Sequence, residues 1–397
     1  MTYGRDGIYL DHAATTPTDP AVVEEMLPYF TGQFGNPSSI YQLGQEGRAA
    51  LDRARSLIAG ALGCRPSEVL FTSGATESNN LALRGIVADW RSRRTADEQP
   101  HVIISAIEHH AVVDVVDDLA TTGVELDVVA CDYHGFIDSH AIRDAVRPNT
   151  ALISVMYANN EIGSVQPIRD IAAVGNERGI PVHTDAVQAA GMLELDARNL
   201  GVDLLSFSAH KFYGPKGVGV LYVKKGTPIR YQQRGGGQES GRRGGTENVP
   251  LIVGMAEALR RADGSRQEYA KHCQTLRDRL WNVLSSEIPD IVINGPEPGP
   301  LRLPNNLNVV VPGVQGETML LNLDLLGVGA SAGSACTTGN SAPSHVLLAI
   351  GRSEAEARAS IRLSVGRGNS AEEIDAAAEA FIDSVTRIRQ LSGVGVS

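Results

Sequence analysis

The stretch IPVHTDAVQAAGMLELDARNLGVDLLSFSAHKFYGPKGVGVLYV, residues 180–223, decides the fold. It holds three short apolar runs, at 180–184, 204–208 and 218–223, which are rich in Val, Ile and Leu and alternate only weakly with polar residues. Such runs are typical of strands that are buried on both faces of a sheet. Polar residues follow two of these runs, with Asp185 after the first and Lys211 soon after the second. We therefore expect a buried sheet whose strand ends carry chemically active side chains.

The same pattern extends toward the N-terminus. Four further apolar runs precede this stretch, at residues 69–72, 101–105, 124–130 and 151–158. Segments with helical periodicity, such as 79–91 and 111–119, lie between them. Because strands that alternate with helices form parallel sheets covered on both sides, the sequence predicts an α/β fold with a mostly parallel, seven-stranded sheet.

The pattern changes after about residue 265. A long helix is expected at 267–288, and the remaining expected elements are strands at 291–294, 307–311 and 361–365 and helices at 317–326 and 371–391. This mixture is typical of a separate, smaller α+β domain. We accordingly predict a large domain over residues 15–262 and a small domain made of residues 1–14 and 263–397.

Composition excludes several classes of protein. The formal net charge of −11 over 397 residues disfavours direct binding to nucleic acid or to anionic membranes, both of which attract basic surfaces. No run approaches the ~20 apolar residues of a membrane span. The four cysteines show neither metal-ligand spacing nor the density of a disulfide scaffold, so we predict no metal site and a reducing, cytoplasmic location.

A candidate phosphate site follows the run at 69–72. The sequence Ser73-Gly74-Ala75-Thr76 places a glycine turn at the start of a predicted helix. The free N–H groups of a helix N-terminus bind anions, and the Thr76 hydroxyl would add a donor. An ordinary helix cap would also explain these residues.

Asp185 and Lys211 complete a pattern that favours pyridoxal phosphate (PLP). A carboxylate at a strand end can hold the pyridinium nitrogen of PLP protonated. A lysine at a strand end can form a Schiff base with the aldehyde of that cofactor. Either residue alone would also suit a helix cap or a solvated lysine. The phosphate site, the acid and the lysine occur in order, each after a strand, and together they favour PLP.

Two loops could complete the ring site. His109 follows the run at 101–105 and could stack on the pyridine ring, and Asn160 follows the run at 151–158 and could bond its phenolic oxygen. Loop residues of both types are also common in purely structural roles.

Cys336 lies in SAGSACTTGNS, residues 331–341, where almost every residue is small or polar. Buried, inert cysteines usually have apolar neighbours, whereas reactive ones sit in accessible, polar surroundings. The segment of about 331–344 is therefore a candidate catalytic-cysteine loop, with a spectator thiol as the alternative. The surroundings of Cys64, Cys131 and Cys273 favour structural roles.

The chain resembles the NifS/IscS-type (group I) cysteine desulfurases of the class V aminotransferase family, which have the aspartate-aminotransferase-like PLP fold. The matching stretches span nearly the whole chain: YLDHAATTP (9–17), FGNPSS (34–39), FTSGATESNN (71–80), EHHAV (108–112), NNEIG (159–163), HTDAVQ (183–188), SFSAHKFYGPKGVGVLYV (206–223), RGGTEN (243–248), GSACTTG (333–339), PSHVL (343–347) and RLSVGR (362–367).

The resemblance implies a role for each matching residue. Lys211 is implied as the Schiff-base lysine, Cys336 as the persulfide carrier, and His109 as the stacking and proton-transfer group. Arg362, together with Asn160, is implied to bind the substrate carboxylate, for which a guanidinium fork is well suited. The residues implied to hold PLP are Gly74, Ala75, Thr76, His109, Asn160, Asp185, Gln188, Ser208, His210, Lys211 and, from the partner of a homodimer, Thr246.

The activity implied by the resemblance is conversion of L-cysteine to L-alanine. The sulfur would be held as a persulfide on Cys336 and passed to an acceptor such as an Fe–S scaffold or a thiolation enzyme. The alternatives are a selenocysteine lyase, another PLP enzyme of the same fold, such as an aminotransferase, or a non-catalytic sulfur-carrier subunit. The sequence does not distinguish Fe–S cluster assembly from tRNA thiolation or DNA phosphorothioation.

Overall fold

The computed structural model describes residues 7–332 and 342–391. Its largest sheet has seven strands in the order β2-β8-β7-β6-β5-β3-β4. The strands are β2 (Val69–Thr72), β3 (His101–Ser105), β4 (Glu125–Val129), β5 (Thr150–Ser154), β6 (Val182–Asp185), β7 (Leu204–Ser208) and β8 (Gly219–Val223). All neighbours are parallel except β8, which runs antiparallel to both β2 and β7. The predicted α/β fold with a mostly parallel, seven-stranded sheet is confirmed.

Helices cover both faces of this sheet. α4 (Ala75–Ser92) and α5 (His110–Ala120) share a core cluster with Leu70, Val102 and Ile104. The neighbouring strand residues, such as Val69 and Ile103, point to the opposite face, because side chains alternate along a strand. There they pack with α3 (Gln42–Ala61), α7 (Ile168–Arg178) and α9 (Val249–Gly264). Double-sided burial explains why the strands are apolar throughout.

The edge strand β4 differs from the prediction of strands buried on both faces. Glu125 and Val128 are exposed, and Leu126 and Asp127 are only half-buried. β4 pairs with β3 alone, so its outer edge borders solvent. The apolar residues of the run at 124–130 therefore predicted more burial than β4 has.

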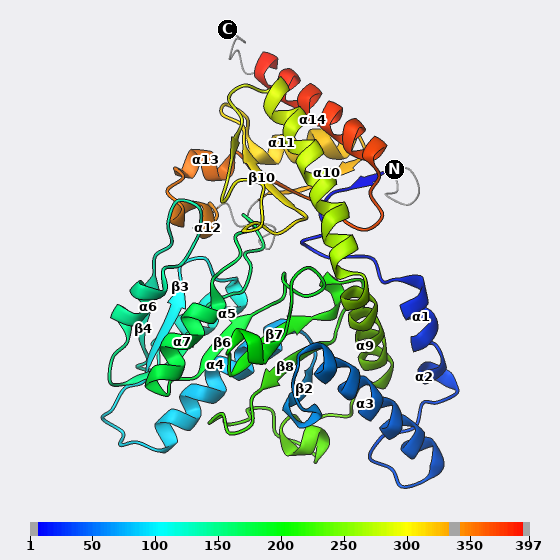
Figure 1. Ribbon diagram of the computed structural model, residues 1–397, viewed down its shortest axis with the longest axis vertical. Helices are drawn as coiled ribbons and strands as arrows, with labels where there is room; N and C mark the ends of the chain where they lie inside the picture. The colour runs from blue at the N-terminus through cyan, green and yellow to red at the C-terminus, as the bar shows by residue number, and fades with distance from the viewer. Residues whose placement is uncertain (1–6, 333–341, 392–397) are drawn as a thin grey trace.

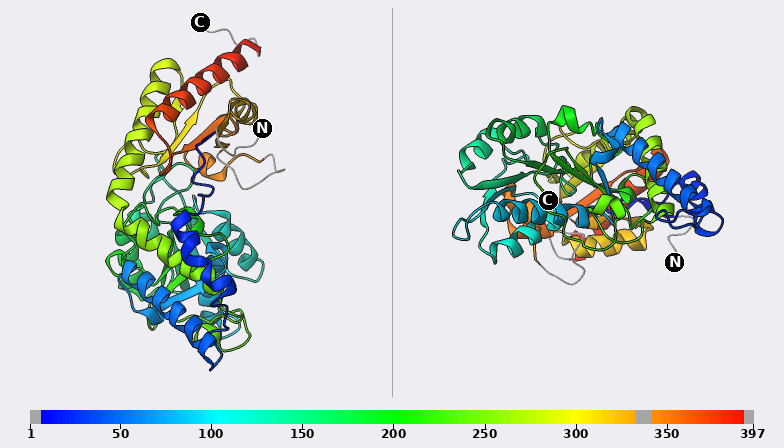
Figure 2. Two further views of the ribbon diagram at one scale, coloured as in Figure 1. Left: turned by 90° about the vertical axis from the view of Figure 1, so that its right-hand side faces the viewer. Right: turned by 90° about the horizontal axis from the view of Figure 1, so that it is seen from below.

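A second sheet lies at the other end of the long axis (Figures 1 and 2). Its order is β12-β13-β10-β9, and these neighbouring strands are antiparallel. The strands are β9 (Val292–Ile293), β10 (Asn306–Val310), β12 (Ser331–Ala332) and β13 (Ser360–Ser364). The long helices α10 (Arg266–Glu287) and α14 (Ala371–Leu391) lie side by side against it (Figure 1). The apolar stripe Ile374, Ala377, Ala378 and Phe381 follows the helical repeat and faces this core.

The N-terminal segment packs beside this second sheet. β1 (Ile8–Tyr9) pairs in parallel with β11 (Val328–Gly329), and the amide of His12 donates to the carbonyl of Ser364. The chain then returns to the large sheet, where the amide of Thr16 donates to the carbonyl of His210. Residues 10–16 therefore cross between the two sheets.

The remaining helices are α1 (Pro20–Met26), α2 (Pro28–Thr31), α6 (Ser139–Ala145), α8 (Ala197–Leu200), α11 (Gly316–Leu325), α12 (His345–Ala349) and α13 (Glu354–Arg358). Short 3₁₀ turns occupy Pro66–Glu68, Ala209–Lys211 and Gln238–Gly241. Within the described part of the chain, none of these helices is both long and apolar enough to cross a bilayer.

Candidate active site

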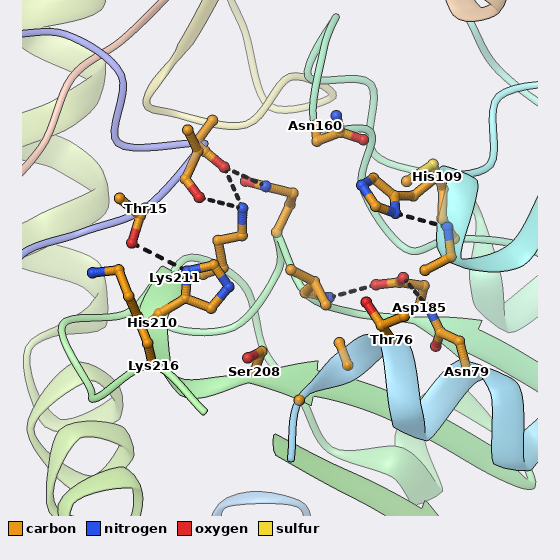
Figure 3. Close-up of a pocket in the computed structure, with 18 of the residues that line it drawn as sticks. Thr15, Thr76, Asn79, His109, Asn160, Asp185, Ser208, His210, Lys211 and Lys216 are labelled. Carbon is orange, nitrogen blue, oxygen red and sulfur yellow. Dashed lines mark hydrogen bonds between the residues drawn. The ribbon is translucent and has the colours of Figure 1, made fainter. Parts of the chain in front are cut away.

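A cavity of about 580 Å³ opens at the carboxyl ends of the central strands. Figure 3 shows side chains around it that come from α4, from the start of α5 and from the ends of β6 and β7. Its lining includes these residues singled out from the sequence: Gly74, Ala75, Thr76, His109, Asn160, Asp185, Gln188, Ser208, His210, Lys211 and Arg362. The parallel strands bring residues that are far apart in sequence to one edge of the sheet.

One wall of the cavity is built to hold an anion. Gly74 is the N-cap of α4 and has no side chain to occupy the helix N–H groups. Strand β8 begins close by: a Cβ on Gly219 would lie 2.6 Å from the backbone of Gly74, so only glycine fits there. Ser208 ends β7 beside this turn, and Lys216 adds a cation to the same lining. Helix N-termini with adjacent hydroxyls and cations bind phosphate.

His210 is neutral at physiological pH. Burial, together with the charges of Lys211 and Lys216, lowers its pKa to about 4. One ring nitrogen, Nδ1, lies 3.2 Å from the hydroxyl of Thr15. A neutral imidazole held in this way offers a phosphate a hydrogen bond without a full charge.

Asp185 is the last residue of β6, and its carboxylate is held on both oxygens. The side-chain amide of Asn79 donates to Oδ2 at 2.6 Å, and the amide of Val187 donates to Oδ1 at 2.9 Å. Asn79 is itself fully buried. These bonds fix the orientation of the carboxylate, and a fixed carboxylate can pair with a pyridinium nitrogen.

The sequence interpretation missed Asn79. It is the fifth residue of α4, three residues after Thr76, and therefore lies on the same face of the helix. Helical periodicity applied to FTSGATESNN would have directed attention to it.

Lys211 stands in the 3₁₀ turn that follows β7. Its Nζ donates to the carbonyls of Ala13 and Ala14, at 2.6 and 2.8 Å (Figure 3). The amide of Gln188 donates to the same Ala13 carbonyl at 3.0 Å. The N-terminal segment of residues 10–16 therefore contacts the lysine directly. This contact makes the motif YLDHAATTP part of the site.

His109 is the N-cap residue of α5. Its Nδ1 accepts a hydrogen bond from the amide of Ala111 at 3.0 Å. This bond assigns the hydrogen of the neutral ring to Nε2. Burial is the main cause that lowers the pKa of His109, and the charge of Lys211 acts in the same direction. The neutral ring can lie against an aromatic cofactor and present a donor at Nε2.

Arg362 enters the cavity from β13 of the second sheet. Its Nη1 donates to the carbonyl of Asn160 at 3.0 Å, and its Nη2 pairs with Asp11 at 2.8 Å. The Nε is buried and has no hydrogen-bond partner among the described residues. Asp11 was not singled out from the sequence, although it lies in the quoted N-terminal motif. It orients the guanidinium, which is suited to a carboxylate ligand.

Among the described residues, the cavity lining does not include every expected site residue. Thr246 is exposed on this chain and lies outside the lining. Cys336 falls outside the described residues. Burial is the main cause that raises the pKa of the other thiols, to about 12 for Cys64, about 11 for Cys131 and about 12 for Cys273. These three remain protonated near neutral pH and are poor nucleophiles.

The residues present fit PLP. An anion cradle, a fixed carboxylate and a lysine line one cavity, and a neutral histidine lies beside them. The fold and the site together define a PLP-dependent enzyme of the fold-type I class.

Comparison with known proteins narrows this class. The aminotransferase class-V family model matches residues 8–377. A cysteine desulfurase IscS of Clostridium botulinum (strain Hall) is 42% identical over 97% of this chain and 96% of its own length. The solved structure of a NifS-like protein matches with a TM-score of 0.89 and 36% identity, over 96% of this chain and 100% of that one. The structure of SspA in complex with cysteine matches with a TM-score of 0.79 and 36% identity, over 90% and 99% of the two chains.

The chain belongs to the aminotransferase class-V family. Class-V aminotransferases and cysteine desulfurases depend on PLP, so PLP is the cofactor of this protein.

Proposed function

We propose that this protein is a cysteine desulfurase, which converts L-cysteine to L-alanine and holds the released sulfur as a persulfide on Cys336. The observation that carries the proposal is the single cavity in which Lys211, Asp185 and His109 meet Arg362 from the second sheet. The family, and relatives named as cysteine desulfurases along nearly the whole chain, support it.

The cofactor would be held by groups already in place. The N-terminus of α4, Thr76, Ser208 and His210 would bind its phosphate, and Gln188 and Asn160, which line the same cavity, would bond its ring oxygen. Asp185 would keep the ring nitrogen protonated. When bound, PLP supplies an electron sink for the bonds at the α-carbon of an amino acid.

The remaining residues act on the substrate. Arg362 would bind the carboxylate of L-cysteine, and this fixes the position of the α-carbon. The amine of Lys211 would remove the α-proton and return it later, as a general base and acid. His109 would serve as a second proton-transfer group through Nε2, since Nδ1 accepts from the amide of Ala111.

Sulfur transfer needs a nucleophile that attacks the substrate sulfur. The Cys336 thiolate would form an S–S bond with that sulfur as the substrate C–S bond breaks. The electron pair of the broken bond would stay with the substrate carbon, which takes up a proton to give alanine. An acceptor thiol would later take the outer sulfur from Cys336 by exchange.

The enzyme is proposed to act as a homodimer in which Thr246 reaches the phosphate site of the partner. Two features of the single chain support this arrangement. Thr246 is exposed and lies outside its own cavity. Large apolar side chains are also exposed over one region of the N-terminal part of the chain: Leu27, Phe30, Phe34, Ile40 and Tyr41. An apolar surface of this kind is typical of a protein interface.

The acceptor is proposed to be a protein thiol in the cytoplasm, on an Fe–S scaffold or a thiolation enzyme. Burial raises the pKa values of Cys64, Cys131 and Cys273, and the resulting poor nucleophilicity of these thiols leaves Cys336 as the proposed donor.

Cofactor loading and turnover test the proposal together. The protein reconstituted with PLP should absorb in the visible range and release alanine from L-cysteine. Lys211→Ala should lose covalent cofactor attachment and turnover. Lys224→Ala should keep both, because this exposed lysine pairs with Asp203 at the opposite end of β7. Wild-type protein that binds PLP but forms no alanine from L-cysteine would exclude the function.

A further inference from the structure

The chain makes an unusual turn directly after Lys211. Tyr213 has a φ of +67°, in the left-handed region that bulky L-residues rarely adopt. In the described part of the chain, the other non-glycine residues with a positive φ are Glu239 and Ser240, which lie outside the cavity lining. Strain of this kind persists only where surrounding contacts hold it, and it is common at functional sites. The conformation of Tyr213 therefore requires contacts that outweigh its strain.

Thr16 holds the two sides of this turn together. Its hydroxyl donates to the carbonyl of His210 at 3.0 Å and accepts from the amide of Tyr213 at 2.8 Å. Its own amide donates to the same His210 carbonyl at 2.9 Å. Thr16 is only 1% exposed, so these bonds are shielded from competition with water. Because His210 and Tyr213 bracket Lys211, one buried hydroxyl spans the turn that carries the lysine.

The phenol of Tyr213 fixes the turn from another direction. Its oxygen accepts from the backbone amide of Arg367 at 2.6 Å and lies 3.1 Å from the hydroxyl of Tyr269. The guanidinium of Arg367 also lies over the Tyr213 ring, 4.3 Å from its centroid. Burial is the main cause that raises the pKa of Tyr213, so the phenol keeps its hydrogen and can donate it to Tyr269. Arg367 follows β13 and Tyr269 lies in α10, so these contacts attach the turn to the second sheet and its helix.

The N-terminal segment bonds both the tip of the lysine and the backbone of its turn. Lys211 Nζ donates to the carbonyls of Ala13 and Ala14. A few residues further on, the amide of Asp19 donates to the carbonyl of Tyr213 at 3.0 Å. The position of the amine in the cavity therefore depends on the conformation of the turn, and a relaxed turn would move it.

We propose that Thr16 and Tyr213 are positioning residues for Lys211. The inference rests on the proposed function in one respect, since it takes Lys211 as the residue that binds PLP covalently. In that step the lysine amine forms a C=N bond with the cofactor aldehyde, and the aldehyde oxygen leaves as water. Loss of either hydroxyl would let the strained turn relax, and the amine would then meet the aldehyde less often in a reactive geometry.

The test is the rate at which PLP attaches to the full-length protein after its cofactor has been removed. Visible absorbance follows the rate, and borohydride reduction with peptide mass spectrometry locates the attachment. Thr16→Val and Tyr213→Phe each remove a hydroxyl with little change in volume. Each should slow attachment to Lys211 by roughly tenfold, the scale of a small misplacement of reacting groups.

The reconstituted holoenzyme gives two further readouts. The pH midpoint of its visible absorbance should shift in both variants, because the lysine nitrogen has new surroundings. The kcat for L-cysteine should fall, whereas its KM should stay within about twofold because Arg362 is untouched. A residue that only stabilises the fold would move neither the pH midpoint nor the attachment rate of the folded protein.

Two control variants separate positioning from packing. Thr16→Ser keeps the hydroxyl and should recover most of the attachment rate. Tyr222→Phe removes the hydroxyl of a tyrosine that is as well buried, at 2% exposure against 5% for Tyr213, but that lies on β8 beside a different cavity. This variant should match the wild type. Urea unfolding of each protein without PLP measures the folded fraction under the assay conditions.

Three results would overturn the inference: a wild-type attachment rate in Tyr213→Phe, an equal loss in Tyr222→Phe, or a loss in Tyr213→Phe that a lower folded fraction explains completely. Failure of the proposed function has a different signature. The wild type would then attach no PLP at Lys211, or would attach it and form no alanine from L-cysteine. In the second case the attachment rates of the variants still decide whether Thr16 and Tyr213 position the lysine.

Discussion

The side-chain amide of Asn79 lies 2.6 Å from the carboxylate of Asp185, and both residues are buried at the floor of the cavity. Asn79 comes from α4, which also forms the phosphate cradle, whereas Asp185 ends β6. One helix therefore supports two ends of the cofactor site.

This contact predicts that Asn79→Ala weakens the enzyme through Asp185. The carboxylate would lose one of its two fixed bonds and hold the ring nitrogen less well. We expect kcat to fall by roughly ten- to hundredfold, the usual scale for a lost supporting contact, and the visible spectrum of the bound cofactor to change its pH dependence. Asn176→Ala, on the outer helix α7, is the control. An unchanged spectrum and kcat in Asn79→Ala would remove Asn79 from the site.

The buried carboxyl of Glu108 predicts a pH-dependent stability. Burial raises its pKa to about 8, and its Oε2 has no partner within the described residues. The folded protein thus binds this proton more tightly than the unfolded chain does. The resulting stability is fully present below about pH 4.5, the ordinary pKa of a glutamate side chain, and is lost as the pH rises toward 8.

Glu108→Gln should remove this contribution. The free energy of unfolding of the wild type should fall, relative to the variant, by at most about 1.4 kcal/mol per pH unit between pH 5 and 8. Urea unfolding at several pH values measures the difference. Glu379→Gln, at an exposed position of α14, should follow the wild type. Parallel pH profiles for wild type and Glu108→Gln would show that Glu108 is ionised in the folded state.

The shared site predicts complementation between two impaired variants. Lys211→Ala lacks the lysine, and Thr246→Ala lacks the hydroxyl proposed to cross to the partner. A hybrid dimer of the two would hold one site in which both residues are native. Mixing the variants after mild dissociation should therefore raise activity above the mean of the parents. Two results would argue against a shared site. One is a fully active protein whose mass in light scattering is that of a monomer, and the other is a mixture whose activity equals the mean of the two parent variants.

The sequence predicts the fold well because most strands of the large sheet are continuous apolar runs. The runs at 69–72, 101–105 and 204–208 coincide with β2, β3 and β7, since double-sided burial demands continuous apolar residues. The short strands β1, β11 and β12 were not predicted. Two residues are too few for a periodic pattern, and these strands depend on partners far along the chain.

Site residues that would contact the cofactor could be predicted, because the chemistry requires particular residue types. Residues that only orient those side chains were harder to predict. Asp185, Lys211 and His109 follow strands and could be found one by one. Asn79 orients Asp185, and Asp11 orients Arg362, each across a long sequence separation, so neither pairing can be read from the sequence. The division at residues 14/15 and 262/263 stays a prediction, because the structure shows how the sheets pack and not how independently they fold.

The central claim is tested most directly by mapping sulfur after L-cysteine is added to the PLP-loaded enzyme. Intact-protein and peptide mass spectrometry should find an increment of one sulfur atom on the Cys336 peptide. Cys336→Ala should bind PLP and L-cysteine but gain no sulfur and release little alanine. A variant with Cys64, Cys131 and Cys273 changed to serine should behave as the wild type. Sulfur on one of those three cysteines, or normal desulfuration by Cys336→Ala, would contradict the account.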